Sequence, residues 1–539
     1  MSTKNNHSLP HVQSLLRRCI SSSERYVISG HLEEAQKELR SREIEINKLK
    51  ADLLMLENER DQLKNRVETF RALLAPVHRL PTELLASILK YAAECGDIHE
   101  QITPTEAPRI VTLSMVCSRW REITLSTPSL WSFISLWLFD WIYKVSPNDD
   151  DEGFGDPKYE FKGVEEISRL KRILQLFLKR SQTTQLDIRL RLTLIQATLL
   201  DYEASVIRSV LEVLVPTASR WKSLNIDLPE DLSSDVSALS LLQNLSSLQH
   251  LDLPLPWHGP HVEGCPSVTS VRLGMATGML LIPWHQVRTL HFTGFGGSVE
   301  QALDTVRSCS GVEDLTLECA PLMVNPPAIP PIVSPCLTSL TLREFQLRPR
   351  PGRTSAFRLF SLPQLSTLTL WADEVNMDIR DFSDFLYRSS CTITHLTIQS
   401  SYMGKYGPKE NEDTIIAFLR LLPTLKVLCL KEKHAPERHR CNKLVSRTLL
   451  RRLSAHRRCY SDSPFLPHLS ELTLSVYGKK LDTEALIEAV ASRWLQAESN
   501  TGITRLQSLN LELIDKSSPT LESLHYLRRA GLKVEIFGC

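Results

Sequence analysis

Several features that mark other classes of protein are missing from this 539-residue chain. Lys and Arg total 63 against 62 Asp and Glu, so the net charge of +1 leaves no overall field to hold a nucleic acid or a membrane surface. The longest apolar stretch, residues 130–143, contains Asp140 and falls short of the roughly 20 residues that a membrane span needs. No charged-then-apolar secretory signal opens the chain, and its twelve cysteines form no CxxC pair. We therefore expect a cytoplasmic or nuclear protein with reduced cysteines.

Motifs that carry catalysis are also missing. The sequence has no phosphate-cradling GxxxxGK[ST], no GxGxxG after a strand, no HExxH and no GxSxG. His439-x-Cys441 and His456-x-x-Cys459 offer four zinc-type ligands, but their spacing matches no known zinc site. We therefore expect no enzyme, no metal and no cofactor. With 42% apolar and 23% charged residues, the chain has the composition of a globular protein.

What the sequence does contain is, first, a heptad pattern from Leu32 to Leu74. One apolar series is Leu32, Leu39, Ile46, Leu53, Val67 and Leu74, and a second, three residues later, is Ala35, Leu49, Leu56, Leu63 and Phe70. Arg60 and Arg42 fill the remaining places, and the segment has neither Gly nor Pro. The pattern predicts a coiled-coil helix at 32–75 after a mostly disordered segment 1–31. The alternative is an amphipathic helix that packs on its own domain.

The charges that flank this heptad leave its partner open. In a parallel homodimer the attractive pairs are Glu45 with Lys50 and Glu59 with Lys64, and the repulsive pairs are Glu38 with Glu43, Asp52 with Glu57, and Arg66 with Arg71. Arg60 at a core position costs stability and either fixes the register or calls for a different helix. A homodimer and another coiled-coil partner therefore both remain hypotheses.

A different pattern follows Pro76. Its motifs are Leu80-Pro81-x-Glu83-Leu84-Leu85-x-x-Ile88-Leu89, then Val116-Cys117-x-x-Trp120-Arg121, and then Pro128-x-Leu130-Trp131. Together they resemble the F-box, in particular its F-box-like variant, over residues 76–133. The resemblance implies a three-helix module that docks on the Skp adaptor of cullin–RING ubiquitin ligases. The link at residues 96–108 is longer than the short turn that is usual in this family, which puts the helix-to-helix geometry in doubt.

The resemblance also implies which residues contact the adaptor. They would be Pro81, Leu84, Leu85, Ile88, Val116 and Trp120. A module of this size has little stability of its own, so apolar residues on its outer side would gain from burial against a partner. The alternative is that these leucines pack on the following domain. That domain is reached through residues 134–163, where alternating aromatics predict a bridging strand and an acidic loop follows.

A repeated phrase, apolar-x-x-Leu-x-apolar, begins near Trp221 and returns eleven times. Its central residues are Leu224, Leu251, Val271, Leu290, Leu315, Leu340, Leu368, Leu396, Leu428, Leu472 and Leu509. The phrase resembles the leucine-rich repeat and predicts an α/β solenoid at 164–539 with a parallel sheet. The Asn or Cys that normally follows each phrase is missing in all eleven copies, so the turn amides need other partners and an irregular solenoid is expected.

In such a solenoid, the residues that alternate with the leucines point away from the core. Trp371 is the unusual one among them, because an outward Trp near an Arg is typical of an interface anchor. We therefore predict a target-binding patch made of Arg343, Trp371, His395, Gln399 and Lys431. The alternative is that loops cover Trp371 as ordinary core.

The sequence as a whole favours a substrate-recognition subunit of a cullin–RING ubiquitin ligase. The F-box-like module would bind the adaptor and cullin complex, and the repeats would capture a protein target that the sequence does not identify. The alternative function is a non-catalytic scaffold that joins two proteins without ubiquitin transfer.

Overall fold

The computed structural model describes most of the chain as two compact units, residues 1–87 and residues 88–539. The described residues are 19–94, 102–104, 107–146, 158–192, 201–227, 245–253, 265–274, 282–293, 299–318, 330–343, 355–372, 379–400, 408–432, 442, 444–455, 464–495, 502–515 and 522–538. The quartet of His439, Cys441, His456 and Cys459 lies outside these ranges.

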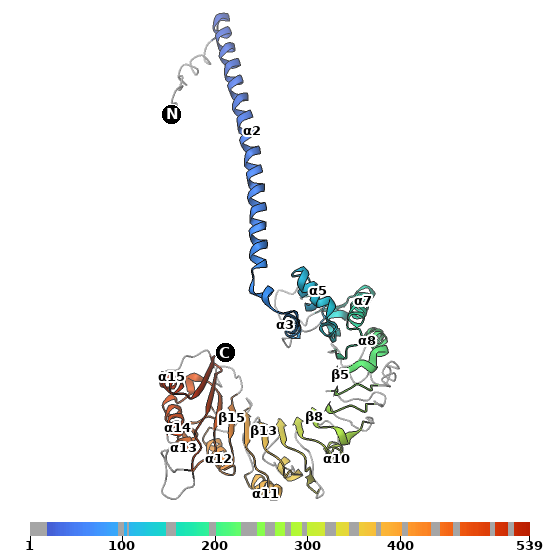
Figure 1. Ribbon diagram of the computed structural model, residues 1–539, viewed down its shortest axis with the longest axis vertical. Helices are drawn as coiled ribbons and strands as arrows, with labels where there is room; N and C mark the ends of the chain where they lie inside the picture. Colours follow the sequence, from blue (N-terminus) through green and yellow to red (C-terminus); the bar gives the residue numbers. More distant parts are fainter. Residues whose placement is uncertain are drawn as a thin grey trace. The chain divides into compact units, whose positions relative to one another are not determined.

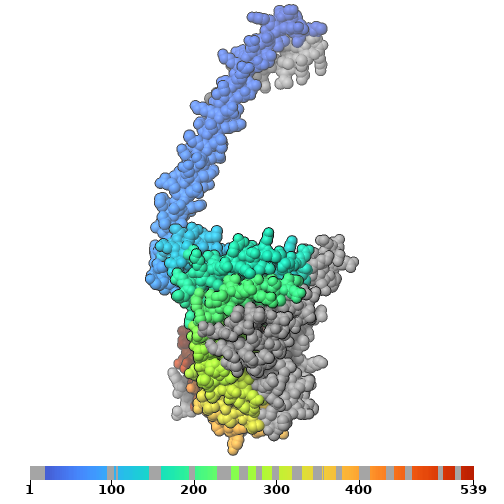
Figure 2. Space-filling model, turned by 90° about the vertical axis from the view of Figure 1, so that its right-hand side faces the viewer, coloured from blue at the N-terminus to red at the C-terminus, as the bar shows by residue number. Residues whose placement is uncertain are grey.

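The first unit is dominated by one long helix, α2 (Ser22–Leu73), which confirms the predicted N-terminal helix. Ser21 and Glu24 form a capping box at its start, where the Ser21 amide donates to the Glu24 carboxylate at 3.0 Å. No residue of α2, the long blue helix of Figure 2, is buried, and all of its side chains except the half-buried Glu24 are exposed. None of the helices in the described ranges is both long and apolar enough to cross a membrane.

Short helices follow α2. The 3₁₀ turn Pro76–Arg79 leads into α3 (Thr82–Glu94), within which the two units divide. The second unit continues with α4 (Arg109–Ser114), α5 (Ser118–Ser126) and the 3₁₀ turn Pro128–Trp131. Trp131 is buried, and its indole N–H donates to the carbonyl of Thr124 in α5 at 2.7 Å.

The rest of the second unit is built on a sheet of fourteen strands, each parallel to its neighbours. In sheet order they are β1 (Phe133–Trp137), β4 (Leu186–Arg191), β5 (Trp221–Asp227), β6 (His250–Leu253), β7 (Ser270–Leu273), β8 (Thr289–Thr293), β9 (Asp314–Glu318), β11 (Ser339–Arg343), β13 (Thr367–Ala372), β14 (His395–Ser400), β15 (Val427–Lys431), β16 (Glu471–Val476), β17 (Ser508–Leu513) and β18 (Lys533–Gly538). The eleven repeated phrases are eleven consecutive strands, β5 to β17, which confirms the solenoid. The sheet has further strands at both ends, beginning with β1.

Helices lie on the outer side of this curved sheet (Figure 1). They are α6 (Leu138–Ile142), α7 (Val164–Arg180), α8 (Asp201–Leu214), α10 (Val299–Ser308), α11 (Ile379–Ser389), α12 (Pro408–Arg420), α13 (Arg447–Leu453), α14 (Thr483–Leu495) and α15 (Glu522–Arg529). Two small pairs of strands complete the unit, β2 (Tyr143–Ser146) with β3 (Lys158–Phe161) and β10 (Ile332–Val333) with β12 (Phe360–Ser361). The central leucines of the phrases are buried, so the alternating residues form the polar, inner face.

Arginine and serine side chains near the ends of two helices bond to backbone groups that precede the strands β13 and β16. The Arg388 guanidinium, at the end of α11, donates to the carbonyl of Phe360 at 2.8 Å, and the hydroxyl of Ser389 accepts a loop amide at 3.0 Å. Arg493 and Ser492 make bonds of the same kind near the end of α14. Side chains of helices that follow these two strands thus satisfy backbone groups that precede them. Most positions where the repeat's Asn or Cys is missing lie outside the described residues.

Candidate functional site

The first candidate surface is the exposed side of α3. Leu85 and Leu89 are buried, whereas Leu84 and Ile88 are 54% and 48% exposed. Residues four apart lie on the same side of a helix, so the exposed and the buried leucines form two separate stripes. Tyr91, which is also exposed, extends the outer stripe by a further turn. A helix with apolar residues on both sides has one side available for a partner.

A second exposed apolar group lies where α4 meets α5. Met115 and Val116 are both exposed, and Trp120, one turn into α5, is half-buried. Of the six residues that the F-box resemblance implies, the exposed ones are Pro81, Leu84, Ile88 and Val116, and Leu85 is the buried one. Tyr91 and Met115 were not among the predicted residues. The sequence held a signal for each: Tyr91 follows the helical spacing of the exposed stripe, and Met115 directly precedes Val116.

The long link between α3 and α4 fastens this region to the sheet. The Ile102 amide donates to the carbonyl of Ser135 in β1 at 2.9 Å, and the Ile102 carbonyl accepts from the Trp141 indole at 2.8 Å. The Arg169 guanidinium of α7 donates to the carbonyl of Pro104 at 2.9 Å. Residues 102–104, a described part of this link, are therefore bonded to β1, α6 and α7.

The second candidate surface is the inner face of the sheet, where the parallel register aligns side chains into rows. One row, on consecutive strands, consists of Thr293, Glu318, Arg343, Trp371, Gln399, Lys431, Ser475 and Glu512. Neighbours in such a row lie about 4.8 Å apart. The register therefore brings together four of the five residues predicted for target binding. His395 is on the same face of β14 but four residues before Gln399, roughly 13 Å along the strand.

Trp371 lies on the polar face, half-buried, and not within the leucine core. The Arg343 guanidinium stacks over its ring at 4.1 Å from the centroid and forms an ion pair with Glu318. Such a cation–π contact holds the indole in one orientation. Within the described ranges, no ion pair forms at Lys431, two strands further along the row. The patch therefore combines an ordered aromatic ring, an amide and a cation that is available to a ligand.

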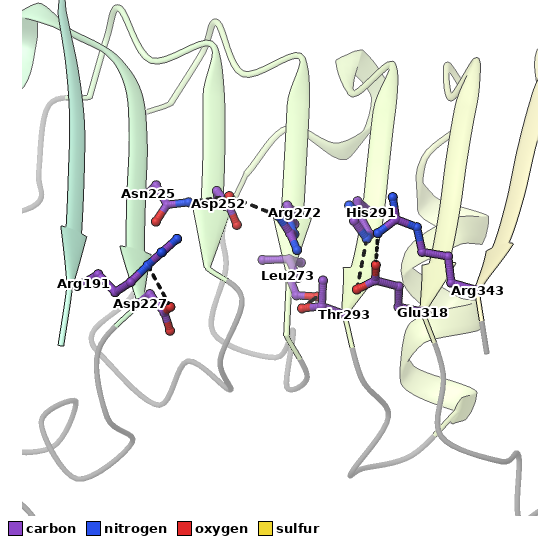
Figure 3. Close-up of polar contacts among 10 residues, drawn as sticks. All are labelled: Arg191, Asn225, Asp227, Asp252, Arg272, Leu273, His291, Thr293, Glu318 and Arg343. Carbon is purple, nitrogen blue, oxygen red and sulfur yellow. Dashed lines mark hydrogen bonds and ion pairs between the residues drawn. The ribbon is translucent and has the colours of Figure 1, made fainter. Parts of the chain in front are cut away.

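Closer to the start of the array, the inner face carries a network of ionised groups (Figure 3). The Asn225 amide donates to the Asp252 carboxylate at 2.5 Å, and Arg272 approaches the same carboxylate at 3.8 Å. Arg191 and Asp227 form a second pair at 3.5 Å. Burial raises the pKa of Asp252, against the opposing effect of Arg272. The pairing across neighbouring strands is incomplete, because Asp252 Oδ1 and Arg272 Nε are buried without a hydrogen-bond partner among the described residues.

His291 is the group of this network with the most displaced pKa. Its Nε2 lies 3.6 Å from a Glu318 carboxylate oxygen, yet burial and the charge of Arg272 outweigh Glu318 and lower the His291 pKa to about 4. The folded protein therefore holds His291 neutral. The stability that this depressed pKa contributes is present above the ordinary value of about 6.5 and is lost as the pH falls toward 4.

We therefore expect His291→Gln to reduce the acid sensitivity of the array. Between pH 7 and pH 4, the wild-type protein should lose on the order of 2 kcal/mol more unfolding free energy than the variant. Urea unfolding of both proteins at a series of pH values measures the difference. If the unfolding free energy depends on pH equally steeply in the two proteins, the depressed pKa of His291 is contradicted.

The described residues contain no cluster of three or more His, Cys, Asp or Glu side chains arranged to hold a metal ion. The first candidate surface is apolar, and the second combines Trp371, Gln399 and Lys431 with charges that pair across neighbouring strands.

Comparisons with known proteins gave one family match and one structural neighbour of low similarity. No curated protein matches it. Among solved structures, an internalin (inlF) from Listeria monocytogenes is similar, at 14% identity over 57% of this chain and 70% of that chain, with a TM-score of 0.22. The model of the F-box-like family matches residues 77–137. The F-box-like segment thus lies at the position that its motifs predict, and the array of parallel strands follows it in the chain.

Proposed function

We propose that this protein is a substrate-recognition subunit of a cullin–RING ubiquitin ligase. The observation that carries the proposal is the exposed apolar stripe of α3, Leu84 and Ile88, within the segment that matches the F-box-like family. In that family, the module docks on a Skp-type adaptor. Exposed aliphatic side chains of this kind are stabilised when a partner removes them from water, by about 25 cal/mol for each Å² that is buried.

The inner face of the repeat array would capture the target. Trp371, Gln399 and Lys431 lie in one row and present an aromatic ring, an amide and a cation with no partner in the described ranges. Interfaces concentrate their binding energy in such aromatic anchors. The target itself would be a protein segment that enters the inner face of the sheet.

The chain would act by tethering and would make or break no bond itself. Binding the target and the adaptor at once raises the effective concentration of target lysines near the ubiquitin-loaded enzyme that other subunits carry. This role needs no cofactor and places the protein in the cytoplasm or the nucleus, where such ligases operate.

The experiment that tests the proposal is co-purification of the full chain with its partners, scored by mass spectrometry. Leu84→Asp combined with Ile88→Asp should reduce the recovery of the Skp-type adaptor and of cullin at least tenfold, because two buried aliphatic contacts become buried charges. Both positions are exposed in the free protein, so the melting temperature should stay unchanged. Undiminished recovery of the adaptor with the double variant would refute the docking role.

Two matched variants make the result specific. Leu495→Asp changes an equally exposed leucine at the end of α14 and should leave adaptor recovery unchanged. Trp371→Ala should retain the adaptor and lose a separate group of proteins, the targets. If neither adaptor nor cullin is recovered with any variant or with the wild type, while Trp371→Ala still loses binding proteins, the scaffold function replaces the ligase function.

A further inference from the structure

The long helix α2 presents a heptad surface that none of the described residues of its own unit buries. Leu39, Leu53, Leu56 and Phe70 are all exposed, and α2 contains no buried residue. A single helix of this length in water gains most of its stability from packing an apolar side against a partner. The charges along the edges of this surface decide which partner fits.

Several of these charged residues have no ion-pair partner within the helix. The pairs along α2 join Arg42 to Glu45 at 3.0 Å and link Asp61 to Arg60 and Lys64. None of these pairs involves Lys50 or Glu57, which flank the heptad core on one side. Those side chains are therefore free to pair with a second helix.

A parallel pairing of two copies fits this sequence poorly. In a parallel pair, each core residue packs against the same residue of the other helix. Arg60 would therefore meet Arg60 of the partner subunit, and Arg42 would meet Arg42 of the partner subunit. Of the five flanking pairs, three join like charges. Like charges at close range in a partly buried seam are destabilising.

An antiparallel pairing reverses the second helix and removes both conflicts. With Leu53 packed against Leu56 of the partner subunit, each core layer joins one residue of the first heptad series to one of the second. Arg60 then faces Leu49 of the partner subunit, where its aliphatic stem packs and its charged end reaches water. The remaining layers join Leu39 to Phe70, Ile46 to Leu63, Val67 to Arg42 and Leu74 to Ala35.

The flanking charges select the same register. In an antiparallel coil, a residue that directly follows the core on one helix faces a residue at the same heptad position of the other helix. The charged pairs therefore differ from those of a parallel coil. The attractive pairs become Lys50 with Glu57, Glu43 with Lys64, and Glu45 with Arg66, and the repulsive pair is Asp52 with Glu59. If one helix is shifted by one heptad along the other, like charges meet. A shift in one direction pairs Lys50 with Lys50 of the partner subunit, and a shift in the other direction pairs Glu57 with Glu57 of the partner subunit. This register is therefore the best of the neighbouring ones.

From this charge and core complementarity, we propose that α2 binds a second copy of this chain as an antiparallel coiled coil, with Leu53 opposite Leu56 of the partner subunit. The two copies of Leu74 leave the coil at opposite ends. The inference is independent of the ligase function, since it rests only on α2.

Engineered cysteines in the full chain test the orientation directly. When Leu39→Cys chains and Phe70→Cys chains are mixed and oxidised, a disulfide should form between positions 39 and 70. Mass spectrometry of the cross-linked peptides distinguishes this disulfide from any that involves a native cysteine. Neither variant alone should cross-link through its new cysteine. A link between two copies of position 39 would show a parallel coil, and a monomer in light scattering at tens of micromolar would show no self-association. Either result overturns the proposal.

A charge reversal provides a second test without cysteines. Glu57→Lys should weaken the dimer about tenfold, because two attractive pairs with Lys50 become repulsive. Adding Lys50→Glu to the same chain should restore the affinity. In a parallel coil Glu57→Lys would face Asp52 and strengthen the dimer, so a tighter dimer would contradict the antiparallel register.

Discussion

Replacing Arg493 with methionine should lower the unfolding free energy of the repeat array by about 3 kcal/mol. Arg493 is almost fully buried in α14 and donates to the carbonyls of Leu453, Phe465 and Leu466 at 2.5, 2.6 and 3.0 Å. Methionine fills much of the same volume but donates no hydrogen bond, so three carbonyls that the guanidinium satisfies lose their partner. The loss exceeds the gain from removing a buried charge, whose desolvation lowers the Arg493 pKa to about 10.

Arg388 provides the matched control for this prediction. It makes the same kind of bonds, to the carbonyls of Phe357 and Phe360 at 2.7 and 2.8 Å, but is itself exposed. Water can reach an exposed site when the side chain is removed, so Arg388→Met should cost only about 1 kcal/mol. Urea unfolding followed by tryptophan fluorescence compares the two variants. Equal losses would show that burial does not set the strength of these bonds.

These arginines also show where sequence reasoning reaches its limit. The eleven phrases predicted their strands because burial on one face imposes a period of two on the leucines, a signal that lies within six residues. The hydrogen bonds of these arginines do not lie within six residues. The Arg493 side chain reaches carbonyls 27 to 40 residues earlier in the chain, and no local pattern announces such a contact.

The strands at the ends of the sheet were harder to predict for a related reason. β1 and β18 each pair with a single neighbour, and neither carries the full repeated phrase. Residues 134–163 were expected to form a bridge, with a strand indicated by the alternating aromatics. The strand is present only as β1, and Phe139 and Trp141 lie in the helix α6 instead. What the sequence could not show is that this strand joins the parallel sheet, because strand pairing depends on β4, about fifty residues later.

The inner-face patch was predicted in part. Knowing that the strands are parallel and in register is enough to align Arg343, Trp371, Gln399 and Lys431. The partner of each charge is not determined by register alone, because side-chain rotamers select among neighbours on both sides. The pairing of Arg343 with Glu318, which leaves Lys431 as the available cation, therefore emerged only from the structure.

Trp141→Phe should lower the unfolding free energy by about 2 kcal/mol and release the link between α3 and α4. Trp141 is fully buried, and its indole N–H is the donor to the Ile102 carbonyl at 2.8 Å. Phenylalanine retains the aromatic packing but leaves this carbonyl buried without its donor. The Ile102 amide, which bonds to β1, should then exchange its hydrogen faster, and proteases should cut the link more readily.

Trp137 in β1 separates this effect from the loss of aromatic volume. Its ring stacks on Phe139 with centroids 5.9 Å apart, but its indole nitrogen is buried and has no hydrogen-bond partner among the described residues. Trp137→Phe keeps the stacking and removes a polar group that makes no bond, so it should change stability by less than about 0.5 kcal/mol. If the two Trp→Phe variants destabilise equally, the hydrogen bond to Ile102 does not fasten the link. A larger loss for Trp141 alone means that this donor of α6 helps to hold residues 102–104 beside the first strand.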